Sequence, residues 1–138
     1  MSLKEEDADE LFQQHIEAQC KRLRILGFTG TPIIRGNLNA MDKSLLPSLQ
    51  TVCTEILNNI AKHGKPGAFA FILSVGPDAV RIFASNLYNA AINSAPENHY
   101  GTALIQDFAQ QHNGTMTINS ENEEWSLSLA IPLTHQTH

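Results

Sequence analysis

Several features that mark membrane, secreted and nucleic-acid-binding proteins are absent from this sequence. It has only two cysteines in 138 residues, Cys20 and Cys53, and they lack the spacing of metal ligands, which predicts buried thiols in a reducing compartment. No stretch approaches the roughly 18 apolar residues of a membrane span, and no signal peptide is visible. The nine Lys and Arg form no dense cluster and the net charge is −5. This charge distribution argues against direct binding of nucleic acid.

The composition is that of one ordinary globular domain. Hydrophobic residues make up 42% of the chain and charged residues 17%, which is typical of a protein that folds around a core. There are no internal repeats and no low-complexity segments. We therefore expect a single cytoplasmic domain without direct membrane contact. The sequence leaves open whether this domain was excised from a larger protein, such as a membrane-anchored receptor.

Hydrophobic periodicity predicts three helices. In chain order they span Leu3–Leu26, a segment from a cap at Asp42 or Ser44 to about Gly64, and Thr102–His112. The third is expected to pack through Ala103, Leu104, Phe108 and Ala109, and to end at Asn113-Gly114, where positive φ is allowed.

Five stretches have the alternation of side chains that is typical of strands. They lie in Ile33–Leu38, Phe69–Val75, Val80–Asn86, Met116–Ile118 and Trp125–Ile131. Gly76-Pro77-Asp78 suits a tight hairpin, and the polar segment Leu87–Asn98 is expected to be a loop. The order predicts an α+β fold: a two-layer sandwich of a mixed five-stranded sheet with helices on one face.

The second helix also has a polar stripe at the edge of its apolar one. Glu55, Asn59 and Lys62 follow one another at spacings of four and three residues, so they share one side of the helix. An acid, an amide and a cation suit a site for a metal ion and a polyphosphate, because they supply oxygen ligands for Mg²⁺ and a positive charge for phosphate. A helix edge with ordinary solvated side chains has the same pattern, and the stripe alone leaves both interpretations open.

Five segments, in this order and spacing, resemble the ATP-binding domain of two-component sensor histidine kinases of the GHKL ATPase superfamily. They are the helix end Cys20–Phe28, the N-box pattern Glu55-x-x-x-Asn59-x-x-Lys62-His63, the strand Val80–Asn86 at the adenine-binding box, the glycine-led helix and H-N-G turn in Tyr100–Met116, and the closing strand Glu124–Leu133. The resemblance covers about four fifths of the chain, from Lys21 to Leu133. The order of the segments is more specific than any one of them.

The resemblance implies a role for each matching residue. The implied site consists of Glu55 as the catalytic acid, Asn59 as the Mg²⁺ ligand, Lys62 and His63 beside the nucleotide, Asn86 at the adenine amino group, and Gly101 at a helix N-terminus facing phosphate. The implied cofactors are ATP and Mg²⁺, and the implied partners are a phosphoacceptor helical domain and a response regulator.

The resemblance also implies a division of the chain. Residues 1–26 would be a helix that leads in from an upstream helical domain or from the boundary of an excised piece. Residues 27–134 would form the histidine-kinase-type ATPase domain, and residues 135–138 a tail. A homodimer through the N-terminal helix is a further expectation.

Two of the matching segments depart from the family pattern. Asn86 replaces an acid that accepts a hydrogen bond from adenine, although its carbonyl oxygen still accepts. Tyr88 replaces a glycine, which adds bulk and restricts φ. The glycine pair before the third helix is reduced to Gly101, and the loop that precedes it has no glycine. These departures predict weak nucleotide binding.

Three functions are compatible with these observations. The first is the catalytic domain of a sensor histidine kinase, which donates the γ-phosphate of ATP to a histidine on another domain. The second is a degenerate domain with weak or no ATP binding that docks proteins. The third, an anti-sigma-type serine kinase, is less favoured because its lid would also need glycines. His15 lies on the first helix without the family's phosphoacceptor signature, so the chain alone is not expected to autophosphorylate.

Overall fold

The computed structural model describes residues 3–38, 41–42, 44–88, 102–121 and 123–133. The elements within these residues are α1 (Leu3–Ile25), β1 (Ile33–Gly36), α2 (Leu45–His63), β2 (Gly64–Val75), β3 (Ala79–Tyr88), α3 (Thr102–Gln111), β4 (Thr115–Glu121) and β5 (Glu124–Pro132). Their order confirms the predicted α+β fold.

The strands form one mixed five-stranded sheet in the order β1-β2-β3-β5-β4. β1 and β2 are parallel, and every other neighbouring pair is antiparallel. A parallel pair needs a long crossover, and α2 supplies it. The predicted hairpin joins β2 to β3, and in it the Gly76 N–H donates to the Ala79 carbonyl at 2.9 Å.

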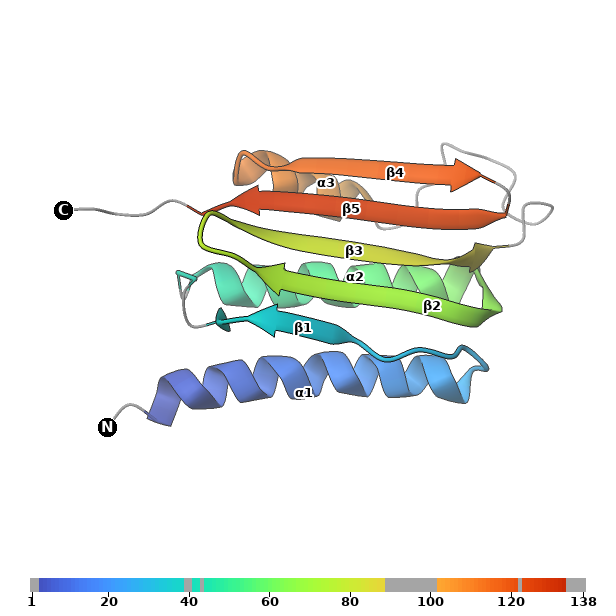
Figure 1. The fold of residues 1–138 in the computed structure, drawn as a ribbon, viewed down its shortest axis with the longest axis horizontal. Helices are drawn as coiled ribbons and strands as arrows, with labels where there is room; N and C mark the ends of the chain where they lie inside the picture. The colour runs from blue at the N-terminus through green and yellow to red at the C-terminus, as the bar shows by residue number, and fades with distance from the viewer. Residues whose placement is uncertain (1–2, 39–40, 43, 89–101, 122, 134–138) are drawn as a thin grey trace.

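The helices cover one face of the sheet. α2 and α3 lie behind the strands in Figure 1 and contact each other, while α1 runs beside β1 and packs against α2. The core fills the space between these layers, with Leu49, Ile56 and Ile60 of α2 buried together with Phe71 and Leu73 of β2. The prediction that α2 and α3 share one face is therefore confirmed.

α1 contributes its apolar stripe to the same core. Phe12, Ile16, Cys20 and Leu23 are at most 1% exposed. Burial, with a smaller contribution from the Glu17 charge, raises the pKa of the Cys20 thiol to about 11, and burial beside Cys20 also raises the pKa of Cys53. Both thiols are free and buried, so they stay protonated and unreactive at neutral pH.

The structure corrects the predicted packing of α3. Ala103 and Leu104 are exposed, and the buried residues are Ile105, Phe108 and Ala109. Ile105 lies three and four residues before the other two, so these three side chains share one face of the helix. The end of the helix is as predicted: Asn113 has a φ of 58°, and the Gly114 N–H donates to the Ala109 carbonyl at 2.6 Å.

The start of β2 and the end of β3 also differ from prediction. β2 starts directly after α2 at Gly64 rather than near Phe69, and β3 continues through Leu87 to Tyr88, where a loop was expected. Ser44 occupies the N-cap position of α2 without a side-chain capping bond. Asp42, three residues before the first helical residue Leu45, instead accepts a hydrogen bond from the Ser44 N–H at 3.1 Å.

The burial of Ile105 and the exposure of its neighbour Leu104 predict that truncating the two side chains lowers the free energy of unfolding by unequal amounts. Ile105→Ala removes a side chain that is 0% exposed and should lower the free energy of unfolding by about 2–5 kcal/mol. Leu104 is 42% exposed, so Leu104→Ala should cost less than about 1 kcal/mol. Urea denaturation of the two variants measures the difference, and equal costs would contradict the observed phase.

Candidate functional site

The polar stripe of α2 lies on its C-terminal half. Asn59 is only 8% exposed, whereas Glu55 and His63 are partly exposed and Lys62 is exposed. The stripe therefore passes from a buried amide, Asn59, to an exposed cation, Lys62, within one helical turn. This gradient of burial suits a ligand whose charged end lies near the exposed Lys62 and which also has a polar group that reaches the more deeply buried Asn59.

Asn59 has an unsatisfied donor. Its Nδ2 is buried and has no hydrogen-bond partner among the described residues. A buried donor without a partner costs about 1–3 kcal/mol, and Asn59 is flanked on its helix by the buried Ile56 and Ile60. The fold alone does not need this amide, and a ligand with an oxygen atom at this position would satisfy it.

Asn86 lies where the resemblance places the contact with adenine, and it is firmly built into the sheet. It is 4% exposed, on β3 between Phe69 of β2 and Trp125 of β5. Its Nδ2 donates to the carbonyl of Leu87. One of the two N–H groups of the amide is used within the protein, which leaves the other N–H and the carbonyl oxygen of the side chain to contact a ligand.

Gly64 connects the two halves of the candidate site. It ends α2, its N–H donates to the Ile60 carbonyl, and it is also the first residue of β2. A Cβ added at Gly64 would overlap Nδ2 of Asn86 and the carbonyl oxygen of Ile60. The end of α2 and the Asn86 side chain are therefore in contact only because residue 64 is a glycine. Sequence reasoning identified Gly64 as a helix stop and missed this contact.

The remaining predicted site positions are only partly described. Gly101 lies outside the described residues, directly before the first residue of α3. Tyr88 is the last residue of β3 and its backbone pairs with Gly64. A surface hollow of about 470 Å³ lies between α2 and α3, and Ser48 and Thr51 in its lining are on the same side of α2 as the stripe, one to two turns before Glu55. A second hollow, of about 320 Å³, lies on the opposite face of the sheet.

The described residues could hold Mg²⁺ only with the help of a ligand. No group of three or more His, Cys, Asp or Glu side chains gathers to bind a metal within the described part of the chain. Mg²⁺ keeps several waters and is commonly held by one or two protein oxygens together with substrate phosphates. Asn59 has one side-chain oxygen and lies three residues before the exposed Lys62, which fits that mode of binding.

His15 has a structural partner. Its Nε2 lies 2.7 Å from Oγ1 of Thr54, and that hydroxyl is 2.9 Å from the Gln50 carbonyl. The Thr54 hydroxyl donates to the carbonyl, so the tautomer in which Nε2–H donates to Thr54 satisfies both groups. His15 is therefore held in place by a side-chain contact. The contact joins α1 to α2 across 39 residues of sequence, and no local sequence motif predicts it.

The whole arrangement is similar to the catalytic domains of histidine kinases. The catalytic domain of the histidine kinase ThkA matches with a TM-score of 0.68 at 11% identity, over 92% of this chain and 95% of that one. The Acinetobacter baumannii histidine kinase AdeS matches with a TM-score of 0.66 at 9% identity, over 94% of this chain and 65% of that one.

A third match is the blue-light activated histidine kinase of Erythrobacter litoralis, with a TM-score of 0.64 at 12% identity, over 94% of this chain and 48% of that one. Neither a family model nor a curated protein sequence matches the chain. The chain therefore has the histidine-kinase-type ATPase fold, and at these identities the likeness extends to the fold alone. No helix among the described residues is long and apolar enough to cross a membrane.

The contact at Gly64 predicts that alanine destabilises the protein more at this position than at Gly76. Gly64→Ala should destabilise the protein by about 1–3 kcal/mol, because the new methyl group overlaps atoms that cannot move freely. Gly76→Ala is the matched control, since its Cβ would approach no atom closer than 3.5 Å, and its φ is not positive. Thermal unfolding of both variants tests this, and a neutral Gly64→Ala would show that the junction relaxes.

The missing phosphoacceptor signature around His15, and the hydrogen bond that its Nε2 makes with Thr54, predict that the isolated chain will not phosphorylate itself on histidine. Incubation with labelled ATP, followed by an acid-lability assay, should show no incorporation. His15→Gln should leave this result unchanged and lower stability by about 1 kcal/mol through the lost hydrogen bond. Acid-labile label that disappears in His15→Gln would contradict the structural role of this histidine.

Proposed function

We propose that this chain is the ATP-binding catalytic domain of a sensor histidine kinase and that it binds MgATP at the C-terminal half of α2. The main support is the buried, unpartnered Nδ2 of Asn59, a residue at the position that the N-box resemblance gives to the Mg²⁺ ligand. The fold supports the proposal independently of that motif. The proposed partners are a phosphoacceptor helical domain and a response regulator, and the proposed location is the cytoplasm.

Each residue of the stripe has a chemical task in this proposal. The side-chain oxygen of Asn59 would hold Mg²⁺, which when bound neutralises phosphate charge, and Nδ2 would donate to a phosphate oxygen. Lys62 is exposed and would offset the charge of the outer phosphates, with His63 beside it. Glu55 would accept a hydrogen bond from the imidazole of the attacking histidine and so orient it. The P–O bond to ADP then breaks as the N–P bond forms, mainly through positioning and charge neutralisation.

The adenine end of the site should bind weakly. Asn86 offers a neutral carbonyl oxygen where a carboxylate would make a charge-assisted hydrogen bond, and such bonds are roughly twice as strong as neutral ones. The strand also continues to Tyr88, where the resemblance expects a glycine turn. We therefore propose that the affinity for nucleotide comes chiefly from the phosphate and metal end.

One observation favours a second function, a protein-docking module that has lost ATP. The Asn86 amide donates to Leu87 and packs against Gly64, so this residue stabilises the sheet in a way that a carboxylate would not. An acid at this position would face the Leu87 carbonyl without a hydrogen to donate. In this alternative, the adenine box has been converted into part of the core.

A substitution of Asn59 distinguishes the ATP-binding catalytic domain from the protein-docking module. Asn59→Leu should remove the Mg²⁺-dependent part of ATP binding and weaken affinity by at least about tenfold. The same change should raise the free energy of unfolding by about 1 kcal/mol, because it removes a buried unsatisfied donor. Isothermal calorimetry with and without Mg²⁺, together with urea denaturation, measures both effects.

Asn58→Leu is the control for this prediction, because it makes the same chemical change at the neighbouring, partly exposed position. It should leave ATP binding unchanged. If the unmodified chain binds no ATP while Asn59→Leu is still stabilising, the docking module is favoured. If Asn59→Leu is destabilising and binding is unaffected, Asn59 is a structural residue and the proposed site is wrong.

A further inference from the structure

The face of the sheet turned away from α2 and α3, which we call the open face, is not covered by any helix or strand of the described residues (Figure 1). It has large apolar side chains in the middle. Phe83 of β3 is 40% exposed and Ile33 of β1 is 43% exposed, with Ile72 of β2 between them in register. We call this cross-strand line of side chains the apolar row. Exposed apolar side chains that adjoin one another are a common mark of an interaction surface.

The next row of side chains, two residues further along each strand, is small. It consists of Ala70 of β2, Ser85 of β3 and Ser126 of β5, which are in register with one another. We call it the small row. A line of large side chains next to a line of small ones makes a ridge beside a trough. A second copy of this surface could pack against it if the apolar row of each copy lay on the small row of the other.

The ends of the open face have opposite charge. Arg35 and Arg81 flank Ser74 on the hairpin side of the apolar row, and Glu124 and Glu121 lie beside Leu87 at the far side of the small row. We call these lines the basic row and the acidic row. None of these four charged residues has an ion-pair partner among the described residues. The order along the strands is therefore basic, apolar, small and acidic.

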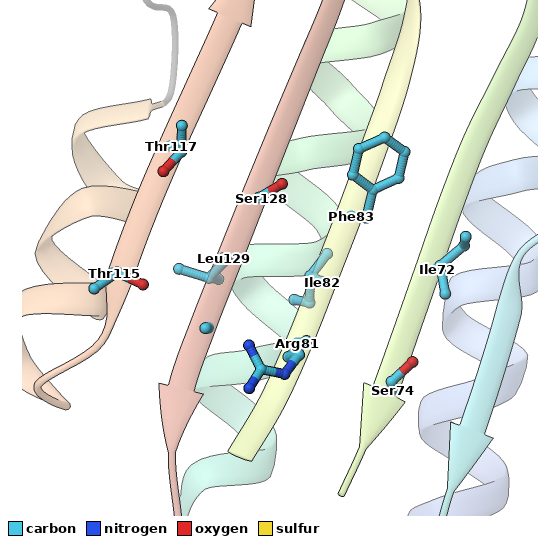
Figure 2. A pocket seen from close by; sticks show the side chains of 10 residues that line it. Ile72, Ser74, Arg81, Ile82, Phe83, Thr115, Thr117, Ser128 and Leu129 are labelled. Carbon is cyan, nitrogen blue, oxygen red and sulfur yellow. The ribbon is translucent and has the colours of Figure 1, made fainter.

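A hollow of about 320 Å³ shows how the large side chains stand above the small ones (Figure 2). Arg81 and Phe83 of β3 form one wall, and Thr115 and Thr117 of β4 form the other. The guanidinium of Arg81 extends toward β5 in Figure 2, where its register partner is Ala130, and Glu124 lies at the other end of that strand. Arg81 is thus placed to meet a group from a second molecule above β5.

We propose that the open face binds the open face of a second copy of this chain, about a two-fold axis perpendicular to the strands and between the apolar and small rows. Such an axis reverses the order of the rows. The apolar row of one copy then lies on the small row of the other, and Arg81 lies near Glu124 of the second copy, twice by symmetry. An axis parallel to the strands would instead place the two basic rows together, which like-charge repulsion disfavours.

The size of the face sets the strength of the dimer. With strands about 4.8 Å apart and about 3.3 Å per residue, four rows on five strands give a flat footprint on the order of 500 Å² per copy. This is below the typical value of about 800 Å² per partner for stable complexes. The dimer should therefore be reversible and depend on concentration. It does not depend on nucleotide binding, which we place on the opposite side of the sheet.

Charge reversal tests the proposal in the 138-residue chain. Sedimentation equilibrium should show a reversible dimer, and Arg81→Glu or Glu124→Arg alone should weaken it about tenfold or more. The double variant, with both charges exchanged, should restore most of the affinity because the ion pairs re-form in the opposite sense. A chain that stays monomeric at high concentration, or a double variant no better than the singles, would overturn the proposal.

Lys21→Glu is the control, since it makes the same charge change on the exposed surface of α1 and should not affect the dimer. A dimer that responds to Lys21→Glu and not to Arg81→Glu would instead form through the N-terminal helix. If a charge variant fails to fold, Ser85→Cys gives a second measurement, because it lies next to the proposed axis. Both native thiols are buried, so a short bismaleimide should join the Ser85→Cys copies to each other. No crosslink would count against the interface.

Discussion

α2 cannot change its orientation without disturbing the whole molecule, because it contacts α1, α3, β2 and β3. Its apolar side, which includes Leu49, Ile56 and Ile60, is buried among these elements. The rotation of the helix is therefore fixed by hydrophobic burial over five turns. That rotation also decides where Glu55, Asn59 and Lys62 lie. The candidate site consequently needs little further support, since the core already sets the direction of its side chains.

The end of α2 imposes a second constraint, which links the site to the sheet. Gly64 ends the helix and begins β2 without an intervening loop, so the last turn of α2 cannot move independently of the strands. Asn86 packs against this glycine. Asn59 lies five residues before it, or about 7.5 Å along the helix axis. A rigid junction of this kind favours preorganisation at the phosphate end of the proposed site, while the same packing makes its proposed adenine end hard to adapt.

Much of the fold could be predicted because periodicity reports burial directly. The apolar stripes of α1 and α2 and the alternation along β2, β3 and β5 each indicated the correct face. The phase of α3 was ambiguous since Leu104 and Ile105 are both apolar and adjacent, and only packing against α2 and the sheet selects between them. Contacts between distant residues were also invisible: Gly64 meets Asn86 and His15 meets Thr54 only after the chain folds. The open face was missed for the same reason, because cross-strand rows depend on register.

The two faces of the sheet differ in the kinds of side chain that they present. The helix-covered face contains the buried amides Asn59 and Asn86 within an otherwise apolar core, and a buried polar group is retained at a cost in stability unless something uses it. The open face has exposed apolar side chains and unpaired charges, whose cost to folding is small because water solvates the charges. In the two proposals, the sheet lies between the ligand site on one side and the association surface on the other. A dimer through the open face would leave the polar stripe of α2 accessible in both copies, so the two proposed activities do not compete for the same surface.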